Sequence, residues 1–243
     1  MDLGKLLLVA AAIVGLVLLI QIAAGPGELP DPPEGRFLDG GTFALVQGGN
    51  RLGEEKFSAW IVAQGFRIDT EVKLAGGEVR QGWMTTASSW SLTRYENLRS
   101  GPRVWETTSV KIEQGQVTVE TKAGLSRKTK KLPEVPPLLV QDPPAVGPWF
   151  AALRMILGGT RRLALLKVRD GQIVPVEVRS MLAVGLQILG KKLPVERYTL
   201  RVGEEEVILY GQGDLLIGLS FPGQGLQAYM VEVLPTGLVE SEL

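Results

Sequence analysis

Apolar and polar side chains alternate along much of this chain, and this two-residue period restricts its possible folds more than any other feature. The clearest example is GFRIDTEVKL, in which Phe66, Ile68, Thr70, Val72 and Leu74 share one face and charged residues occupy the other. Successive side chains of a β-strand point to opposite sides of a sheet, so this segment is predicted to be a strand with one buried face.

The same alternation returns many times, and turn residues such as Gly76-Gly77 and Gln114-Gly115 separate the repeats. We expect further strands at residues 55–61, 78–86, 90–97, 103–112, 116–122, 125–132, 161–168, 172–183, 193–202, 205–211, 215–221 and 226–234. Short strands in series with almost no crossover helices favour a mainly β fold with an antiparallel sheet. We expect a barrel or half-barrel around one short helix. A sandwich also fits this pattern.

The two-residue period is interrupted beside a proline-rich segment. Residues 132–148 contain six prolines, and residues 148–157 (PWFAALRMIL) carry apolar side chains at helical spacing behind a proline suited to a first helical turn. We therefore expect one short helix there. Either half of the chain alone would form a sheet without a covering face, so we interpret residues 37–243 as one β-rich domain.

The N-terminal segment is apolar at residues 6–24 apart from Gln21. A helix of this length covers about 28 Å, close to the ~30 Å hydrocarbon thickness of a bilayer. Lys5 precedes the apolar run and acidic residues follow it, which favours a cytoplasmic N-terminus. We expect residues 1–24 to be an uncleaved transmembrane anchor, so that the membrane is a partner through residues 6–24. A cleaved signal peptide is the alternative.

Residues 25–36 (GPGELPDPPEGR) contain four prolines, which favours an extended spacer between the membrane and the domain. Both interpretations of residues 1–24 export the remainder of the chain. The predicted location is therefore the cell membrane, with the domain in the periplasm or on the cell surface. A lipoprotein is excluded because the chain has no cysteine to carry a lipid.

The amino-acid composition excludes the enzyme mechanisms that depend on cysteine or histidine side chains. Without cysteine there are no thiolate nucleophiles or thiolate metal sites, and without histidine the commonest general base and transition-metal ligand are missing. Basic and acidic residues balance at 26 each, so the net charge attracts no nucleic acid, and we expect no such partner. Carboxylate chemistry remains open, but no pair of carboxylates stands out. We expect no catalytic residues, no metal and no cofactor.

The loop VQGGNRLGEEKFS, residues 46–58, resembles the first part of a phosphate-binding P-loop. A P-loop needs a lysine after its last glycine and a following helix, whereas here two glutamates follow Gly53 and the alternation of a strand begins. We therefore expect this loop to turn a hairpin of four to five residues, with Asn50 and the glycines at the turn.

The run SRKTKK at residues 126–131 places positive charge on both faces of a predicted strand, which is typical of an edge strand exposed to water. The alternative is a functional basic patch for anionic lipid headgroups or a cell-wall polymer. Its members would be Arg127, Lys128, Lys130 and Lys131.

Two predicted strands place an indole on the same face as small polar groups. Trp83 alternates with Thr85, and Trp105 alternates with Thr107 and Ser109. Binding cavities combine aromatic walls with a few polar groups, so these five residues are candidate ligand contacts. The alternative is that the tryptophans cap the rim of a barrel core.

The order of these features resembles a known group of proteins. A membrane-targeted N-terminus, the hairpin from TFALVQ to GEEKFSAW, a proline-rich middle with a short helix, and a last strand LQAYMVEVLP are similar to bacterial envelope domains related to lipoprotein-localisation carriers. The resemblance covers most of residues 42–235. It implies an unclosed antiparallel barrel around a helix, which sometimes holds acyl chains, but this chain lacks the lipidated cysteine of the acceptor-type members.

The leading hypothesis is a non-enzymatic, membrane-tethered domain that binds an apolar or amphipathic envelope molecule such as a lipid or glycolipid. A second hypothesis is a structural or adaptor domain that docks a protein partner through the strand edge near Lys128. A third is a carboxylate-dependent hydrolase of cell-wall sugar.

Overall fold

The computed structural model describes residues 34–102, 104–188, 191–234 and 237–241. The predicted membrane anchor at residues 1–24 and the linker at residues 25–36, except for its last three residues, lie outside this part of the chain. Within the described residues, no helix is both long enough and apolar enough to cross a bilayer.

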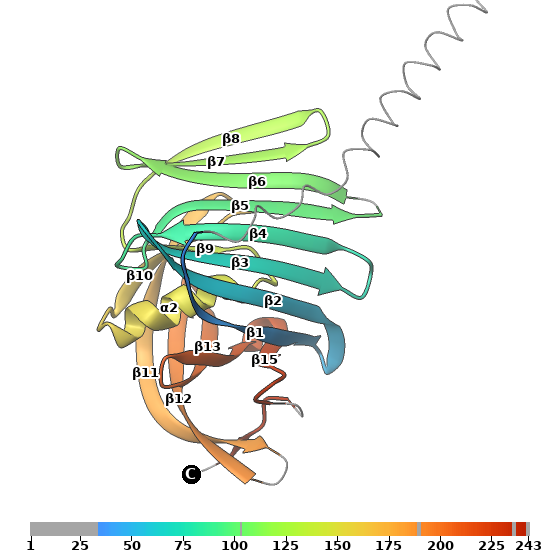
Figure 1. The fold of residues 1–243 in the computed structure, drawn as a ribbon, viewed down its shortest axis with the longest axis vertical. Coiled ribbons are helices and arrows are strands. Elements are labelled where there is room, and N and C mark those ends of the chain that lie inside the picture. Colours follow the sequence, from blue (N-terminus) through green and yellow to red (C-terminus); the bar gives the residue numbers. More distant parts are fainter. Residues whose placement is uncertain (1–33, 103, 189–190, 235–236, 242–243) are drawn as a thin grey trace, which may run out of the picture. The chain divides into compact units, whose positions relative to one another are not determined.

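The first half of the described chain is an antiparallel meander in which each strand pairs with the next. Its strands are β1 (Arg36–Gln47), β2 (Asn50–Val62), β3 (Gly65–Leu74), β4 (Val79–Thr86), β5 (Leu92–Gly101), β6 (Val104–Glu113), β7 (Gln116–Ala123) and β8 (Ser126–Pro133). They follow one another in space from β1 to β8, and β8 is one end of the sheet (Figure 1).

The second half continues the same sheet, because β1 also pairs with β15. Its strands are β9 (Leu138–Gln141), β10 (Arg162–Lys167), β11 (Gln172–Ile188), β12 (Lys191–Val202), β13 (Glu205–Gln212), β14 (Leu215–Phe221) and β15 (Leu226–Met230). A one-turn helix η1 (Pro222–Gln224) joins β14 to β15, and the short β16 (Glu240–Ser241) pairs with β11.

The alternation predicted from the sequence sets the two faces of the β1–β8 half. Ile68 and Val72 of β3 are buried, as are Met84 of β4 and Val110 of β6. We call this the inner face, because it packs against the single α-helix of the described residues. Side chains at the intervening positions, such as Asp69, lie on the outer face. Antiparallel sheets often have one packed and one solvated face.

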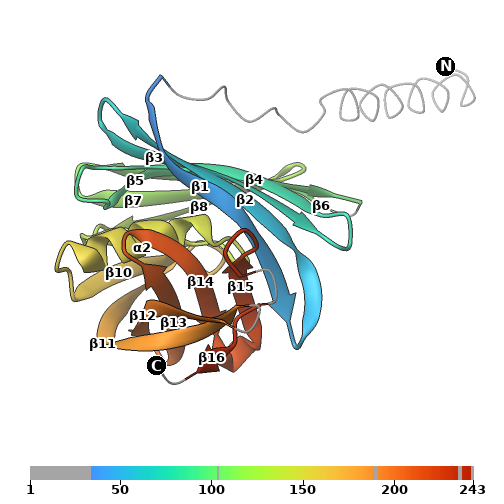
Figure 2. The ribbon, with the colours of Figure 1, turned by 60° about the horizontal axis from the view of Figure 1, so that its bottom comes forward.

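That helix, α2 (Gly147–Leu157), lies between the β1–β8 half and the strands of the second half (Figure 2). Trp149, Phe150 and Leu153 are all at most 1% exposed. The ring centroids of Phe150 and of Phe57 in β2 are 5.7 Å apart, so the helix contributes directly to the aromatic core. At the first helical residue, a side-chain Cβ on Gly147 would lie 2.4 Å from Cγ2 of Thr70, so only glycine allows this close approach.

The glycine-rich loop turns a hairpin, as predicted, but a tighter one. Gln47 pairs with Asn50, so the connection between β1 and β2 is two residues long instead of four to five. Gly48 and Gly49 have φ values of 57° and 81°. A two-residue turn with positive φ at both positions matches the right-handed twist of the strands, and glycine adopts it without strain.

Three features of the fold differ from the prediction. The proline-rich connection contains the strand β9, whose four residues are all buried, so alternation could not reveal it. β9 pairs with β10 in parallel, so the sheet is not wholly antiparallel. The sheet path runs from β8 to β9 and does not close, so the closed barrel is wrong and the sheet is open.

Candidate polar pocket

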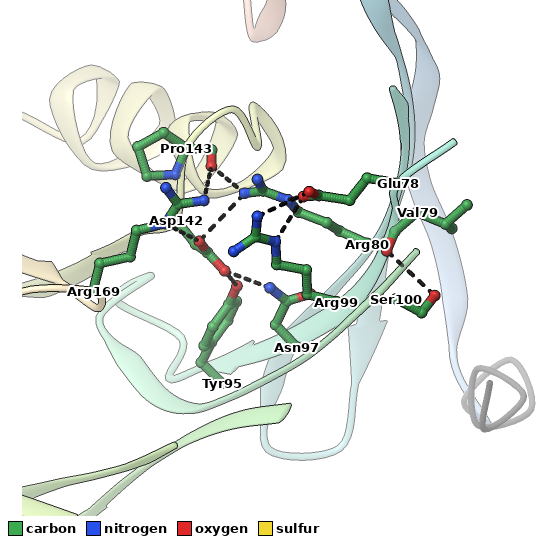
Figure 3. A network of polar contacts seen from close by, with 10 residues as sticks. All are labelled: Glu78, Val79, Arg80, Tyr95, Asn97, Arg99, Ser100, Asp142, Pro143 and Arg169. Carbon is green, nitrogen blue, oxygen red and sulfur yellow. Dashed lines mark hydrogen bonds and ion pairs between the residues drawn. The ribbon is translucent and has the colours of Figure 1, made fainter. Parts of the chain in front are cut away.

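Asp142, which directly follows β9, is 6% exposed and lies at the centre of a buried polar network. Its Oδ2 accepts hydrogen bonds from the Tyr95 hydroxyl at 2.8 Å and from Nδ2 of Asn97. Arg80 Nη1 and Arg169 Nε lie 3.6 and 3.8 Å from its Oδ1 (Figure 3). Burial and the Asp142 charge raise the pKa of Tyr95, so its hydroxyl remains a donor.

The network continues through Arg80 to a second carboxylate. Arg80 is 6% exposed; its Nε donates to Glu78 Oε1 at 2.7 Å, and its Nη1 donates to the carbonyl of Pro143. Arg99 donates to both oxygens of Glu78, at 2.8 and 2.9 Å. The hydrogen bonds from Arg99 and Arg80 lower the pKa of Glu78 to about 2, so this carboxylate stays ionised and keeps both guanidinium groups in place.

A pocket of about 300 Å³ opens beside this network. Its wall comes from the inner face of β5 to β8, from the residue after β9, and from the turn between β10 and β11. The lining residues are Asn97, Arg99, Glu106, Thr108, Thr121, Lys128, Asp142, Val168 and Arg169. Strand pairing places several of them side by side, since Arg99 lies opposite Glu106 and Thr108 opposite Thr121.

The lining is polar, and it carries three cations against two carboxylates. Lys128 makes no hydrogen bond or ion pair to another described residue, whereas Arg99 is held by Glu78 and Arg169 by Asp142 and the Pro143 carbonyl. Thr108 and Thr121 add hydroxyl groups on the same wall. An unpaired ammonium beside hydroxyls can bind an anionic group that also carries hydroxyls.

A second pocket, of about 180 Å³, shares Val168 and Arg169 with the first. Its other lining residues are Gln141, Pro143, Lys167, Asp170, Glu205 and Gln224. Glu205 accepts from Lys167 at 3.2 Å and from Gln224 at 3.1 Å, so these polar groups are already paired. The first pocket, with its free lysine, is the better candidate site.

Away from the pockets, the buried carboxylate of Glu55 holds α2 against the sheet. Glu55 of β2 is fully buried, and its two oxygens accept hydrogen bonds from the backbone N–H groups of Val146 at 2.5 Å and Gly147 at 2.7 Å. Those N–H groups would otherwise lack partners, because no side chain of the helix caps its N-terminus. Burial outweighs these bonds and raises the pKa of Glu55 to about 7.

The structure separates the predicted aromatic contacts from this pocket. Trp83, Thr85, Trp105, Thr107 and Ser109 all occupy outer-face positions, and none of them lines either pocket. The Trp83 ring lies between two guanidinium groups on that face, with Arg94 at 4.9 Å and Arg67 at 5.4 Å from its centroid. Ligand binding by these five residues stays a prediction.

The predicted basic run forms β8, and its position at the end of the sheet confirms an edge strand. Its side chains alternate between the two faces of the sheet, and a basic patch of Arg127, Lys128, Lys130 and Lys131 stays a prediction. Lys128 lines the pocket, and Lys130 on the same face donates to the Asp170 carbonyl at 3.3 Å. On the outer face Arg127 pairs with Glu120 at 2.5 Å, and Lys131 shares that face.

Comparison with known proteins gives no relative. No family model matches the chain, and the comparisons with curated proteins and with solved structures found no match. Among the described residues, no group of three or more acidic side chains is arranged to hold a metal ion. The chemistry of the site therefore rests on its own geometry.

Proposed function

We propose that this chain is a non-catalytic binding protein whose 300 Å³ pocket takes the anionic, hydroxyl-bearing headgroup of an amphipathic cell-envelope molecule. The observation that carries this proposal is Lys128, an ammonium without a partner among the described residues, on the same wall as two threonine hydroxyls. The expected membrane anchor at residues 6–24 supports an envelope ligand and an extracytoplasmic location.

The interior of the sheet favours recognition of a headgroup over enclosure of an acyl chain. The side chains of α2 fill the space between the two halves of the sheet, and Trp149, Phe150 and Leu153 are fully buried there. Protein interiors packed in this way leave few voids larger than a water molecule. The apolar part of the ligand would then stay outside the pocket.

The proposal predicts that Lys128→Gln weakens binding of dihexanoyl-phosphatidylglycerol about 10- to 100-fold, because a hydrogen bond to a charged group contributes about 1.5–3 kcal/mol. Titration of the full-length chain in detergent, followed by native mass spectrometry, measures the affinity. The zwitterionic dihexanoyl-phosphatidylcholine should bind weakly to both proteins.

Lys131→Gln is the matched control, because Lys131 lies on the same strand but on the outer face. Its affinity should stay within twofold of the wild-type value. Equal losses in both variants would show that the lipid responds only to the net charge of β8, and an unchanged affinity in Lys128→Gln would refute the pocket as the site.

The strand edge keeps a second function open. β8 ends the sheet, and residues Ser126–Lys131 are exposed, so its free backbone groups could add a strand from a protein partner. Reproducible crosslinking of one protein through β8, without a bound lipid, would favour this adaptor function. The hydrolase is less supported, because Asp142, one of the two pocket carboxylates, is already occupied by Tyr95 and Asn97.

A further inference from the structure

The hairpin turn between β7 and β8 carries an apolar side chain that the fold does not use. Ala123 pairs with Ser126, so Gly124 and Leu125 form a two-residue tip, and Leu125 is fully exposed. The other two-residue tips of which both residues are described are small or polar: Gly48-Gly49, Ala63-Gln64, Gln114-Gly115, Gly203-Glu204 and Gly213-Asp214. Hairpin tips favour glycine, asparagine and aspartate, so turn geometry does not explain a leucine here.

A second exposed apolar side chain lies beside this tip. Glu106 pairs with Ala123, which places Trp105 at the level of Gly124 in the neighbouring strand. The Trp105 side chain is 44% exposed on the outer face. Trp105 and Leu125 are therefore two large apolar side chains at the same end of the strands, beside the turn between β7 and β8. Neither of them belongs to the core.

Basic side chains lie in the strands beside these two apolar groups. Lys122 and Arg127 face each other across β7 and β8 on the outer face, at 3.0 and 2.5 Å from the single carboxylate of Glu120. At this end of the strands the basic residues Lys122, Arg127 and Lys128 outnumber the acidic residues Glu106 and Glu120 by one, so the local net charge is +1 in a chain whose overall charge is zero.

We propose that the tip formed by Trp105, Leu125, Lys122 and Arg127 docks on an anionic membrane surface. Tryptophan and leucine partition into the interface between headgroups and acyl chains, and lysine and arginine keep their charges at the level of the headgroups. Anionic lipids attract such basic groups, and the attraction decreases with salt. Lys128, three residues from Leu125, would bring the polar pocket next to the headgroups, but the docking itself does not depend on ligand binding in that pocket.

A single fluorescent label tests this proposal in the full-length chain, because the protein has no native cysteine. The Leu125→Cys variant is labelled with NBD and reconstituted into vesicles of phosphatidylcholine alone or of phosphatidylcholine with about 30 mol% phosphatidylglycerol. The second composition contains an amount of anionic lipid similar to that of natural membranes. We expect a blue shift of the emission, and quenching by doxyl-labelled lipid, in the anionic vesicles only. Both signals should fall at least threefold when Lys122 and Arg127 are replaced by glutamine.

Gln64→Cys is the matched control, since Gln64 is exposed in the two-residue tip between β2 and β3, at the opposite end of the strands. Its label should stay in water in both vesicles. Quenching of the Gln64 label in place of the Leu125 label would overturn the proposal, and so would a Leu125 label that stays in water. Equal insertion of Leu125 in neutral vesicles would refute the role of the basic residues. A blue shift without lipid quenching would show that the label packs against the protein and not the bilayer, and it would also overturn the proposal.

Discussion

Replacing Asp142 with alanine should lower the free energy of unfolding by about 3–5 kcal/mol. The carboxylate is 6% exposed and is the acceptor for the Tyr95 hydroxyl and the Asn97 amide, and Arg80 Nη1 lies 3.6 Å away. Its removal leaves these buried donors without an acceptor and takes one of two carboxylate partners from a buried guanidinium group. Urea unfolding followed by tryptophan fluorescence measures the change.

Asp214→Ala is the control for this prediction, because Asp214 also pairs with an arginine, Arg154 at 2.7 Å, but its side chain is 71% exposed. Exposed ion pairs contribute about 0–1 kcal/mol, so this variant should unfold almost as the wild type does. Tyr95→Phe, which removes a single donor, should give an intermediate loss of about 1 kcal/mol. Similar losses in Asp142→Ala and Asp214→Ala would contradict the importance of burial.

The strands were predictable from the sequence because most of them have one buried and one solvated face. β3 is the clearest case, and its predicted inner residues Ile68 and Val72 are buried. The same reasoning missed β9, since LLVQ is buried on both faces and shows no alternation. It also truncated β11, which extends to Ile188. There Leu186 is buried in a second, smaller hydrophobic cluster with Val195 and Ile208, which the sequence did not indicate.

The pocket could not be predicted from the sequence. Its wall combines polar residues on the inner face of the sheet, where alternation predicts apolar ones, with residues from segments that are distant in the sequence. In β6 the outer face carries Trp105 and Thr107. The inner face carries Glu106 and Thr108 together with the buried Val110. Both faces are therefore mixed in polarity, and alternation did not reveal which of them lines a cavity. Asp142 lies 45 residues from Asn97 and within the proline-rich segment. One signal was present, since the alternation of SRKTKK did place Lys128 on the face opposite to Lys131.

Glu55 should make the chain less stable as the pH rises from 4.5 to 7. Burial raises the pKa of this carboxyl to about 7 in the folded protein, against 4.5 for an unperturbed glutamate. The folded state therefore binds a proton more tightly than the unfolded state does. The stabilisation is complete below pH 4.5 and is lost as the pH rises through 7, at about 1.4 kcal/mol per pH unit and about 3 kcal/mol in total.

Glu78 has the opposite shift, but it acts in a different pH range. Its pKa is lowered to about 2, so its contribution is present above pH 4.5 and is lost only as the pH falls towards 2. Urea unfolding at pH 5, 6, 7 and 8 therefore avoids the titration of Glu78. Burial also raises the pKa of Asp39 and of Asp69, so the Glu55 component is the difference between the wild type and a Glu55 variant. The free energy of unfolding of the wild type should fall across this series.

Glu55→Gln should remove this component of the pH dependence, because the amide cannot ionise. The variant should be about 1–3 kcal/mol less stable than the wild type at pH 5, since the amide oxygen can accept from only one of the N–H donors of Val146 and Gly147, and the amide NH2 group faces the other. This deficit should shrink or reverse by pH 8, where the wild type carries a buried charge. Glu54→Gln, the neighbouring substitution on the outer face, should keep the wild-type slope. Parallel pH profiles for the wild type and Glu55→Gln would show that the Glu55 carboxyl does not contribute to the pH dependence in this range, which would contradict its raised pKa.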